Sequence, residues 1–115
     1  MAGVIGEAER RARIRELNDQ VRTTFTGGVV VLSAGVAAMP PAARSAALQA
    51  VRAFNRFDGD NDPWGEQNFG EAYAGDLRLF FKIDYYDRGM VSASIDPADP
   101  TVTTRVLTIM LAAEY

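Results

Sequence analysis

Residues 77–86 have the sequence LRLFFKIDYY. Apolar residues at the odd positions alternate with arginine, phenylalanine, lysine and aspartate at the even positions, and this period of two is typical of a strand with one buried face. Gly75-Asp76 provides a turn just upstream, and residues 66–74 form a second extended stretch before it. The two stretches predict a β-hairpin, from which the rest of the fold can be worked outward.

Three further stretches are strand candidates. Residues 29–32 (VVVL) are aliphatic and bounded by glycines, which indicates a buried strand. Residues 90–95 follow the turn at Asp87-Arg88-Gly89 and are expected to form another strand. Residues 101–115 fit a helix by their spacing, but their many β-branched residues favour a strand, which we take as the prediction.

Two helices complete the prediction. Between Glu7 and Phe25, apolar residues recur every three to four positions, as on the buried stripe of an amphipathic helix. Pro40-Pro41 starts a second helix that is expected to run to Phe57 and to stop at Asp58-Gly59. The sequence thus predicts one α+β domain over residues 1–115, with residues 1–6 flexible and two helices packed on an antiparallel sheet of four to five strands.

The composition excludes several chemistries. The chain has 115 residues and contains neither cysteine nor histidine. Disulfides are therefore impossible, catalytic triads of the usual kind lack their imidazole base, and structural zinc lacks its usual ligands. We expect no cofactor and no catalytic residue, and no segment resembles a secretory signal or a membrane span, so a cytoplasmic protein is expected.

Charge is distributed unevenly along the chain. The net charge is −3, but residues 1–56 carry eight arginines and four acids, whereas residues 57–115 carry eleven acids and four basic residues. The acidic half is the stronger candidate for a binding surface. The candidate partner-binding residues are Asp58, Asp60, Asp62, Trp64, Glu66, Glu71, Asp84, Asp87, Asp96 and Asp99.

Individual positions in this acidic half have simpler structural interpretations. Asp58, Asp60 and Asp62 open like a calcium loop, but the glycine and glutamate that such a loop needs later are replaced by Pro63 and Phe69, so turn formation is favoured. Lys82 and Asp84 are expected to form an ion pair on a solvated sheet face. Trp64 is expected at the edge of the core, and Tyr85 is expected to cover the core with its hydroxyl in water.

A secondary basic patch comprises four arginines of the first predicted helix. They could contact phosphate or a carboxylate-rich surface, but acids share the same helix and the whole chain is acidic, so direct nucleic-acid binding is not expected. The patch consists of Arg10, Arg11, Arg13 and Arg15.

Several long strings are specific enough to suggest relatives: DPWGE and FG in residues 62–70, KIDYYD in 82–87, RVLTIMLA in 105–112 followed by EY in 114–115, and LND in 17–19. With them, the chain resembles an uncharacterised bacterial family of unknown function that is carried on plasmids and other mobile elements. Relatives commonly have Glu-His-Asp where this chain has Glu66-Gln67-Asn68, and the loss of the imidazole and of one carboxylate argues against an enzyme.

We therefore expect a non-enzymatic acidic binding protein. The best specific candidate is an inhibitor of a host defence complex, of the anti-CRISPR or anti-restriction type, that acts by steric and electrostatic blockade. The expected partner is a protein, with a nucleic-acid-binding defence complex as the specific candidate. No membrane partner is expected, and homodimerisation is an option on base rates. Two alternatives stay open. One is a small carboxylate-dependent enzyme or divalent-metal binder centred on Asp62, Glu66, Asp84 and Asp87, and the other is a plasmid accessory protein that binds its partner through the arginine-rich helix.

Overall fold

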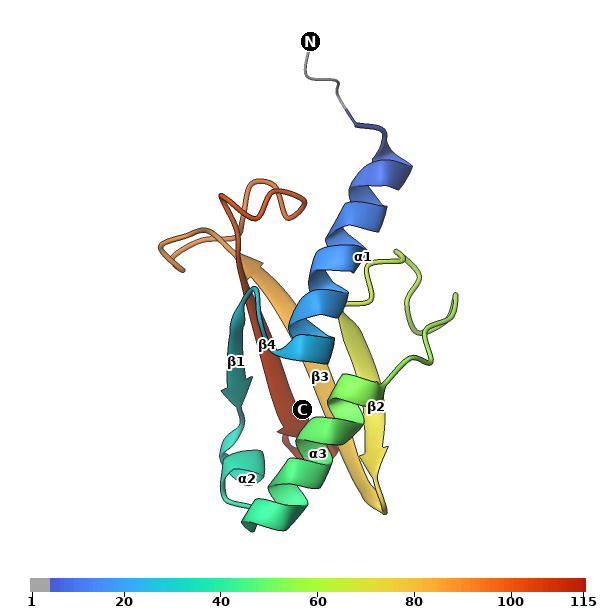
Figure 1. Cartoon of the computed structure of the whole chain (residues 1–115), viewed down its shortest axis with the longest axis vertical. Helices are drawn as coiled ribbons and strands as arrows, with labels where there is room; N and C mark the ends of the chain where they lie inside the picture. The colour runs from blue at the N-terminus through green and yellow to red at the C-terminus, as the bar shows by residue number, and fades with distance from the viewer. Residues whose placement is uncertain (1–4) are drawn as a thin grey trace.

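Helix α1 (Glu7–Thr24) lies across one face of a four-stranded sheet, and its N-terminal half projects beyond the sheet (Figure 1). The structure is a computed structural model that describes residues 5–115. The flexible segment expected at residues 1–6 falls largely on residues 1–4, outside the described residues. The α+β class predicted from the sequence is confirmed.

The sheet has the order β1-β4-β3-β2 and is mixed. Strands β2 (Phe69–Ala74) and β3 (Leu77–Tyr86) form the predicted hairpin, and β4 (Thr104–Leu111) pairs antiparallel with β3. Strand β1 (Val29–Leu32) runs parallel to β4, so the expectation of a purely antiparallel sheet is wrong. The residue pattern of β1 marks it as a strand, but nothing local sets its direction, which follows from the return of the chain through two helices. The expected burial of this strand is wrong, because β1 lies at an edge of the sheet and Val29 and Val31 are exposed.

The helices also differ from the prediction. Besides α1 there is a one-turn helix α2 (Ala34–Ala37), whose first turn is capped by the Ser33 hydroxyl, and helix α3 (Pro41–Ala53). The predicted continuation of α3 to Phe57 is wrong. The guanidinium of Arg22 donates to the carbonyl oxygens of Arg52 (3.3 Å) and Phe54 (2.5 Å), which satisfies this helix end.

Residues 90–95 do not form the expected strand. They contribute only an isolated bridge between Tyr86 and Ala93, within a long irregular connection from residue 87 to residue 103. The final segment is the expected strand, β4, followed by a short 3-10 turn at Ala112–Glu114. Short loop bonds and turns, rather than a ladder, therefore hold the 87–103 connection.

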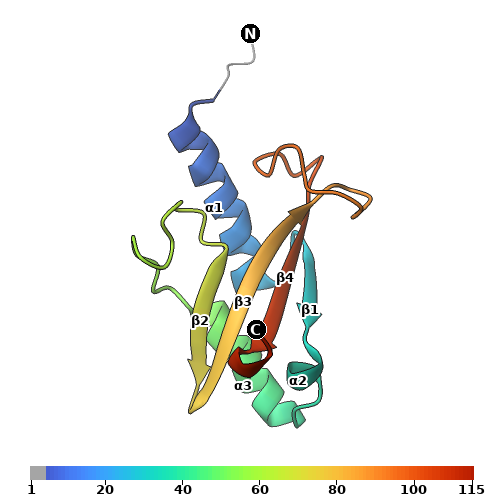
Figure 2. The ribbon, with the colours of Figure 1, turned by 180° about the vertical axis from the view of Figure 1, so that it is seen from behind.

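The core lies between the helices and one face of the sheet. Alternate residues of β3 and β4 point toward α1 and α3, and Leu79, Phe81, Leu107 and Ile109 have no exposed surface. Over the part of the chain that the structure describes, no α-helix covers the opposite sheet face, and the C-terminal 3-10 turn lies against it (Figure 2). No helix in residues 5–115 has the length and apolar character needed to cross a bilayer.

Candidate partner-binding end

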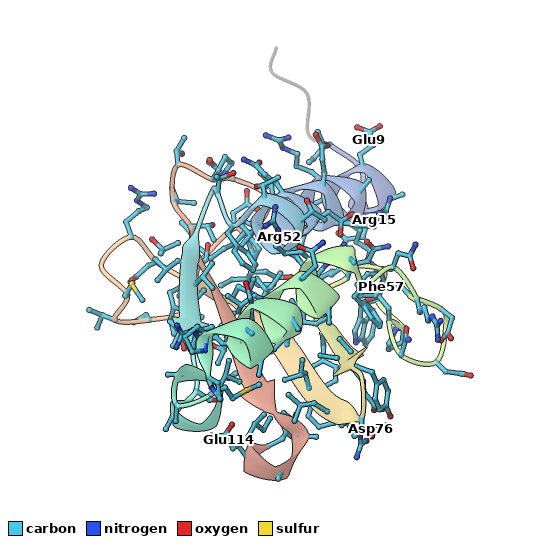
Figure 3. All side chains as sticks on the ribbon, turned by 60° about the horizontal axis from the view of Figure 1, so that its bottom comes forward. Glu9, Arg15, Arg52, Phe57, Asp76 and Glu114 are labelled. Carbon is cyan, nitrogen blue, oxygen red and sulfur yellow. The ribbon has the colours of Figure 1, made fainter. Side chains whose placement is uncertain are left out.

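One end of the molecule is built from the N-terminal half of α1 and two long loops. Residues 54–68 lie on one side of α1 and residues 87–103 on the other, in both views of the ribbon (Figures 1 and 2). We call residues 7–15, 54–68 and 87–103 the loop end. Glu9 and Arg15 lie there, whereas Asp76 and Glu114 lie at the opposite end (Figure 3).

A buried polar network holds this end together, and Asn18 is its centre. Asn18 is fully buried on α1, and its Nδ2 donates to the carbonyl oxygen of Glu66 (2.9 Å) and to the hydroxyl of Tyr85 (2.7 Å). Its Oδ1 accepts a bond from Nε of Arg105 (2.8 Å). One helix side chain thus contacts the 54–68 loop, β3 and β4, and a single asparagine amide can do so because it both donates and accepts.

Arg105 extends the network to the second loop. Its guanidinium donates to the carbonyl oxygen of Pro97 and lies over the ring of Tyr85, 5.2 Å from the ring centroid. No carboxylate lies within ion-pair distance of Arg105 in the described residues. Burial accordingly lowers the pKa of the guanidinium, and neutral acceptors with an aromatic face take the place of a counter-ion.

Tyr85 departs from its sequence-based expectation. Its hydroxyl was expected in water, but it donates to Oε1 of Glu66 (2.7 Å) and accepts from Asn18. Burial, followed by the contact with the Glu66 carboxylate, raises the pKa of this hydroxyl. The tyrosine is therefore a neutral donor over the physiological pH range and serves to anchor the 54–68 loop.

The arginines of α1 contact both loops rather than projecting freely. Arg10 pairs with Asp96 of the 87–103 loop (3.2 Å), whereas Nη1 of Arg15 donates to the carbonyl oxygen of Gly65 (3.2 Å). The Arg11 guanidinium lies 5.7 Å from the ring centroid of Trp64. Within the helix, Arg11 also pairs with Glu7 (3.7 Å), and Arg13 pairs with Glu16 (3.5 Å). The predicted basic and acidic patches thus meet in one surface.

The predicted acidic residues separate into two groups. Most lie on the two loops, which together carry seven carboxylates and two arginines. Glu71 and Asp84 lie instead on the helix-free face of the sheet, where they pair with Arg78 (2.9 Å) and Lys82 (3.1 Å). The predicted Lys82–Asp84 pair is confirmed. The loop group comprises Asp58, Asp60, Asp62, Glu66, Asp87, Asp96 and Asp99.

Most of the loop carboxylates also shape their own turns. Oδ1 of Asp58 accepts from the backbone of Asp60 and Asn61, and Oδ1 of Asp99 accepts from the hydroxyl and the backbone of Thr101, which lowers the pKa of Asp99. In residues 5–115 no three acidic side chains lie close enough together to hold a metal ion. The candidate centre of Asp62, Glu66, Asp84 and Asp87 is spread over two loops and a strand.

Large apolar side chains are exposed at the tips of these loops. Trp64 is 67% exposed, so its expected place at the core edge is wrong, because the ring rests against Arg11 instead. On the second loop Val91 is 86% and Ile95 is 88% exposed. The loop end therefore combines carboxylates with apolar side chains on anchored loops, which is the composition of a protein-binding surface.

Sequence reasoning did not identify the residues that build this end. Asn18 and Arg105 take inward positions on α1 and β4, but a polar residue type does not by itself indicate burial, because its partners come from distant parts of the chain. The useful signal was indirect: Asn18 lies at an inward position of α1 between Ile14 and Val21, both of which are buried.

Comparison with known proteins gives a family but no activity. No curated protein and no solved structure matches the chain. The family model described as "Protein of unknown function (DUF3768)" matches residues 32–114, which include the 54–68 loop, the 87–103 loop and every strand except the first three residues of β1. The chain therefore belongs to this family of proteins of unknown function.

Proposed function

We propose that this protein is a non-enzymatic binding protein whose loop end docks onto a basic surface of a protein partner. The observation that carries the proposal is the arrangement of two acidic loops on either side of α1, both tied to Asn18 and Arg105. Because these anchors are buried, the loops lose little conformational freedom on binding, which favours affinity.

Electrostatic complementarity supports a basic partner surface. Asp58, Asp60 and Asp62 form no ion pair within the described residues, so their charge faces outward. A surface of spaced carboxylates resembles a phosphate backbone in charge, and it would be attracted to the lysines and arginines that line a nucleic-acid channel. Occupation of that channel would exclude the nucleic acid by both volume and charge.

The exposed apolar tips supply the second part of the interface. Aromatic and aliphatic anchors carry much of the binding energy in protein complexes, and charges around them set specificity and association rate. Trp64, Val91 and Ile95 are suitable anchors because each is largely exposed in the free protein. This mixture argues for a protein partner rather than for a small ligand.

The most specific form of the proposal is inhibition of a host defence complex of the CRISPR or restriction type. Its support is the acidic character of the loops together with the resemblance to proteins carried on mobile elements, for which blocking such a complex is advantageous. The proposal accounts for the absence of histidine and cysteine, because steric blockade needs no reactive side chain.

Affinity capture and competition test the proposal. The tagged protein is incubated with lysate of a bacterium that carries the gene, and captured proteins are identified by mass spectrometry. The purified partner is then mixed with its nucleic acid and with increasing amounts of this protein. We expect mutually exclusive binding that weakens with salt. A ternary complex with unchanged nucleic-acid affinity would overturn the blockade mechanism.

The arginine-rich helix remains the alternative binding surface, and one substitution separates the two. Arg13→Glu reverses the charge of the patch arginine whose ion-pair partner, Glu16, lies on α1, and it leaves the contact of Arg11 with Trp64 in place. Capture should persist if the loops bind the partner. Loss of capture by this folded variant would assign the binding to the helix instead.

A further inference from the structure

Strand β2 forms a free edge of the sheet, and the start of the 54–68 loop lies beside it. It is the last strand in the order β1-β4-β3-β2, and in residues 5–115 β3 is its only partner. It is six residues long and has the sequence FGEAYA, without proline or lysine. Edge strands usually carry such protective residues, because an open edge pairs readily with another chain.

The register shows which backbone groups point outward. The amide of Ile83 donates to the carbonyl oxygen of Asn68, which makes these two residues a hydrogen-bonded pair. Since such pairs alternate along an antiparallel ladder, Phe69, Glu71 and Tyr73 direct their N–H and C=O groups away from β3. Within residues 5–115 no loop or side chain bonds to these groups.

A groove follows the same edge. Two hollows of ≈ 320 and ≈ 400 Å³ share Phe54, Arg56 and Glu71 among their lining residues and therefore adjoin one another. The C-terminal end of α3 and the start of the 54–68 loop form one wall, and β2 forms the other. Ala50 and Ala53 line the α3 part of that wall, and their methyl groups suit small or branched side chains.

A cation, Arg56, lies along the groove. Arg56 lines both hollows and is exposed, and in the described part of the chain no carboxylate lies within 4.0 Å of its guanidinium. Two carboxylates also line the groove. Glu71 is bonded to Arg78 and to the hydroxyl of Tyr73, and the bond from Arg78 lowers its pKa, while Oδ1 of Asp58 accepts from the backbone amides of Asp60 and Asn61. An incoming carboxylate would therefore meet Arg56 without displacing an existing pair.

We propose that the edge of β2 binds an extended peptide segment of a partner protein, which adds to the sheet as a fifth strand and presents a carboxylate to Arg56. The outward backbone groups provide main-chain hydrogen bonds, the alanine-lined wall selects small apolar side chains, and Arg56 selects an acidic residue. This is strand addition, a recurring mode of peptide recognition.

A second copy of the chain fits this edge less well. In symmetric antiparallel pairing of two β2 strands, outward residues must pair with outward residues, and the register that pairs all three of them places Glu71 opposite its own copy. Like charges directly opposite each other destabilise a strand pair. The wall that carries Arg56 would likewise approach its own copy and bring two positive charges together. A peptide with a negative charge opposite Arg56 is therefore the better occupant.

A display library of random eight-residue peptides tests the proposal. We expect selection on the full-length protein to enrich alternating sequences with β-branched residues and at least one glutamate or aspartate. Two synthetic copies of the selected peptide are then compared, one N-methylated at the odd backbone amides and the other at the even ones. One copy should lose binding and the other should keep it. A library without enriched binders, or binding that both N-methylated peptides retain, would overturn strand addition.

Substitutions in the protein complete the test. Tyr73→Pro removes one outward N–H without removing a bond to β3, and Tyr73→Ala is its matched control, since both lose the tyrosine side chain. We expect Tyr73→Pro to weaken peptide binding about tenfold or more relative to Tyr73→Ala. Arg56→Glu should weaken peptide binding similarly. Arg88 is an exposed arginine on the 87–103 loop, and Arg88→Glu should leave peptide binding unchanged.

Two further readouts keep the outcomes separate. If Tyr73→Pro fails to fold, as judged by circular dichroism, the methylated peptides and Arg56→Glu decide the question. Sedimentation of the wild type identifies the competing occupant, because a dimer that Arg56→Glu or Tyr73→Pro dissociates would assign the edge to a second copy and overturn the proposal. Peptide binding that Arg56→Glu leaves unchanged would remove the role assigned to the carboxylate.

Discussion

Arg105 on β4 donates from Nε to the side-chain oxygen of Asn18 on α1 across 2.8 Å, although 87 positions separate the two residues. The bond joins an early helix to the last strand at the end of the molecule where both long loops leave the sheet. Through Glu66 and Pro97 the same two side chains reach each loop. A buried arginine that loses its hydrogen-bond acceptors lowers the stability of the fold. The geometry of this end therefore depends on the pair of Asn18 and Arg105.

Asn18→Ala should therefore lower the free energy of unfolding by about 2–4 kcal/mol, because Arg105 and the Glu66 carbonyl lose buried partners. Urea unfolding at neutral pH measures the change. Gln20→Ala, at an exposed position of the same helix, is the control and should stay within about 0.5 kcal/mol of wild type. Equal stability of the two variants would show that the network does not stabilise the fold.

Gly70→Ala should destabilise the hairpin. An added Cβ would lie 2.4 Å from the Phe81 ring and 2.8 Å from the Phe54 ring, and Phe81 is fully buried, so one ring must shift. Overpacking of this kind costs about 1–3 kcal/mol. Gly59→Ala is the matched control, since nothing lies within 4 Å of its added Cβ. A Gly70→Ala variant as stable as Gly59→Ala would contradict this close packing.

Acid should remove the contribution of Glu114. Its carboxylate accepts bonds from the Ser33 hydroxyl (2.6 Å) and from the backbone amides of Leu111 and Gly35 (2.9 Å each), and these bonds, the Ser33 bond foremost, hold its pKa below the ordinary value of 4.5. Because the pKa of Glu114 is lower in the folded state than in the unfolded state, the carboxylate stabilises the fold fully when the pH is above the ordinary pKa. This stabilisation is lost as the pH falls through the folded-state pKa.

The comparison of wild type with Glu114→Gln isolates this effect. At pH 7 the variant should unfold at a lower urea concentration, and the difference between the two midpoints should shrink as the pH falls below the ordinary value of 4.5. A difference that stays constant from pH 7 to strongly acidic pH would show that the charge of Glu114 contributes nothing.

Divalent metals should not stabilise the protein. No three acidic side chains of residues 5–115 converge on a common point, and ligands that bind the folded state specifically raise its melting temperature. We expect the melting temperature with calcium, magnesium or manganese at about 1 mM to equal that in EDTA. A rise of several degrees would revive the metal-binding alternative that includes Asp62 and Glu66.

The strands that could be predicted are those whose local pattern is sufficient. The alternation in residues 77–86 identified β3, and β-branched density identified β1 and favoured the strand over the helix in β4. The direction of β1 could not be predicted, because parallel and antiparallel partners both accept an aliphatic strand. The strand expected at residues 90–95 failed because its residues find no continuous partner beyond the single bridge at Ala93.

The candidate site was predictable in composition but not in construction. Charge counting located the acidic half of the chain, and the structure places most of those carboxylates on two loops at one end. That the arginines of α1 lie between these loops depends on long-range contacts such as Arg10 with Asp96, 86 positions apart. The exposure of Trp64 was likewise missed, because a tryptophan in a loop is locally compatible with either core or surface.

Removal of loop charge with retention of the turns tests the central claim most directly. Asn keeps the Oδ1 acceptor that Asp58 and Asp62 use in their turns, so the triple variant Asp58→Asn, Asp60→Asn, Asp62→Asn should fold like wild type. The matched control removes three charges elsewhere, through Glu71→Gln, Asp76→Asn and Asp84→Asn. Both variants are compared with wild type for binding to the captured partner at several salt concentrations.

We predict that the loop variant binds at least about tenfold more weakly than wild type, with a smaller dependence on salt, while the control binds like wild type. Equal affinity of the loop variant and wild type, with both folded, would contradict the claim that the acidic loops bind the partner.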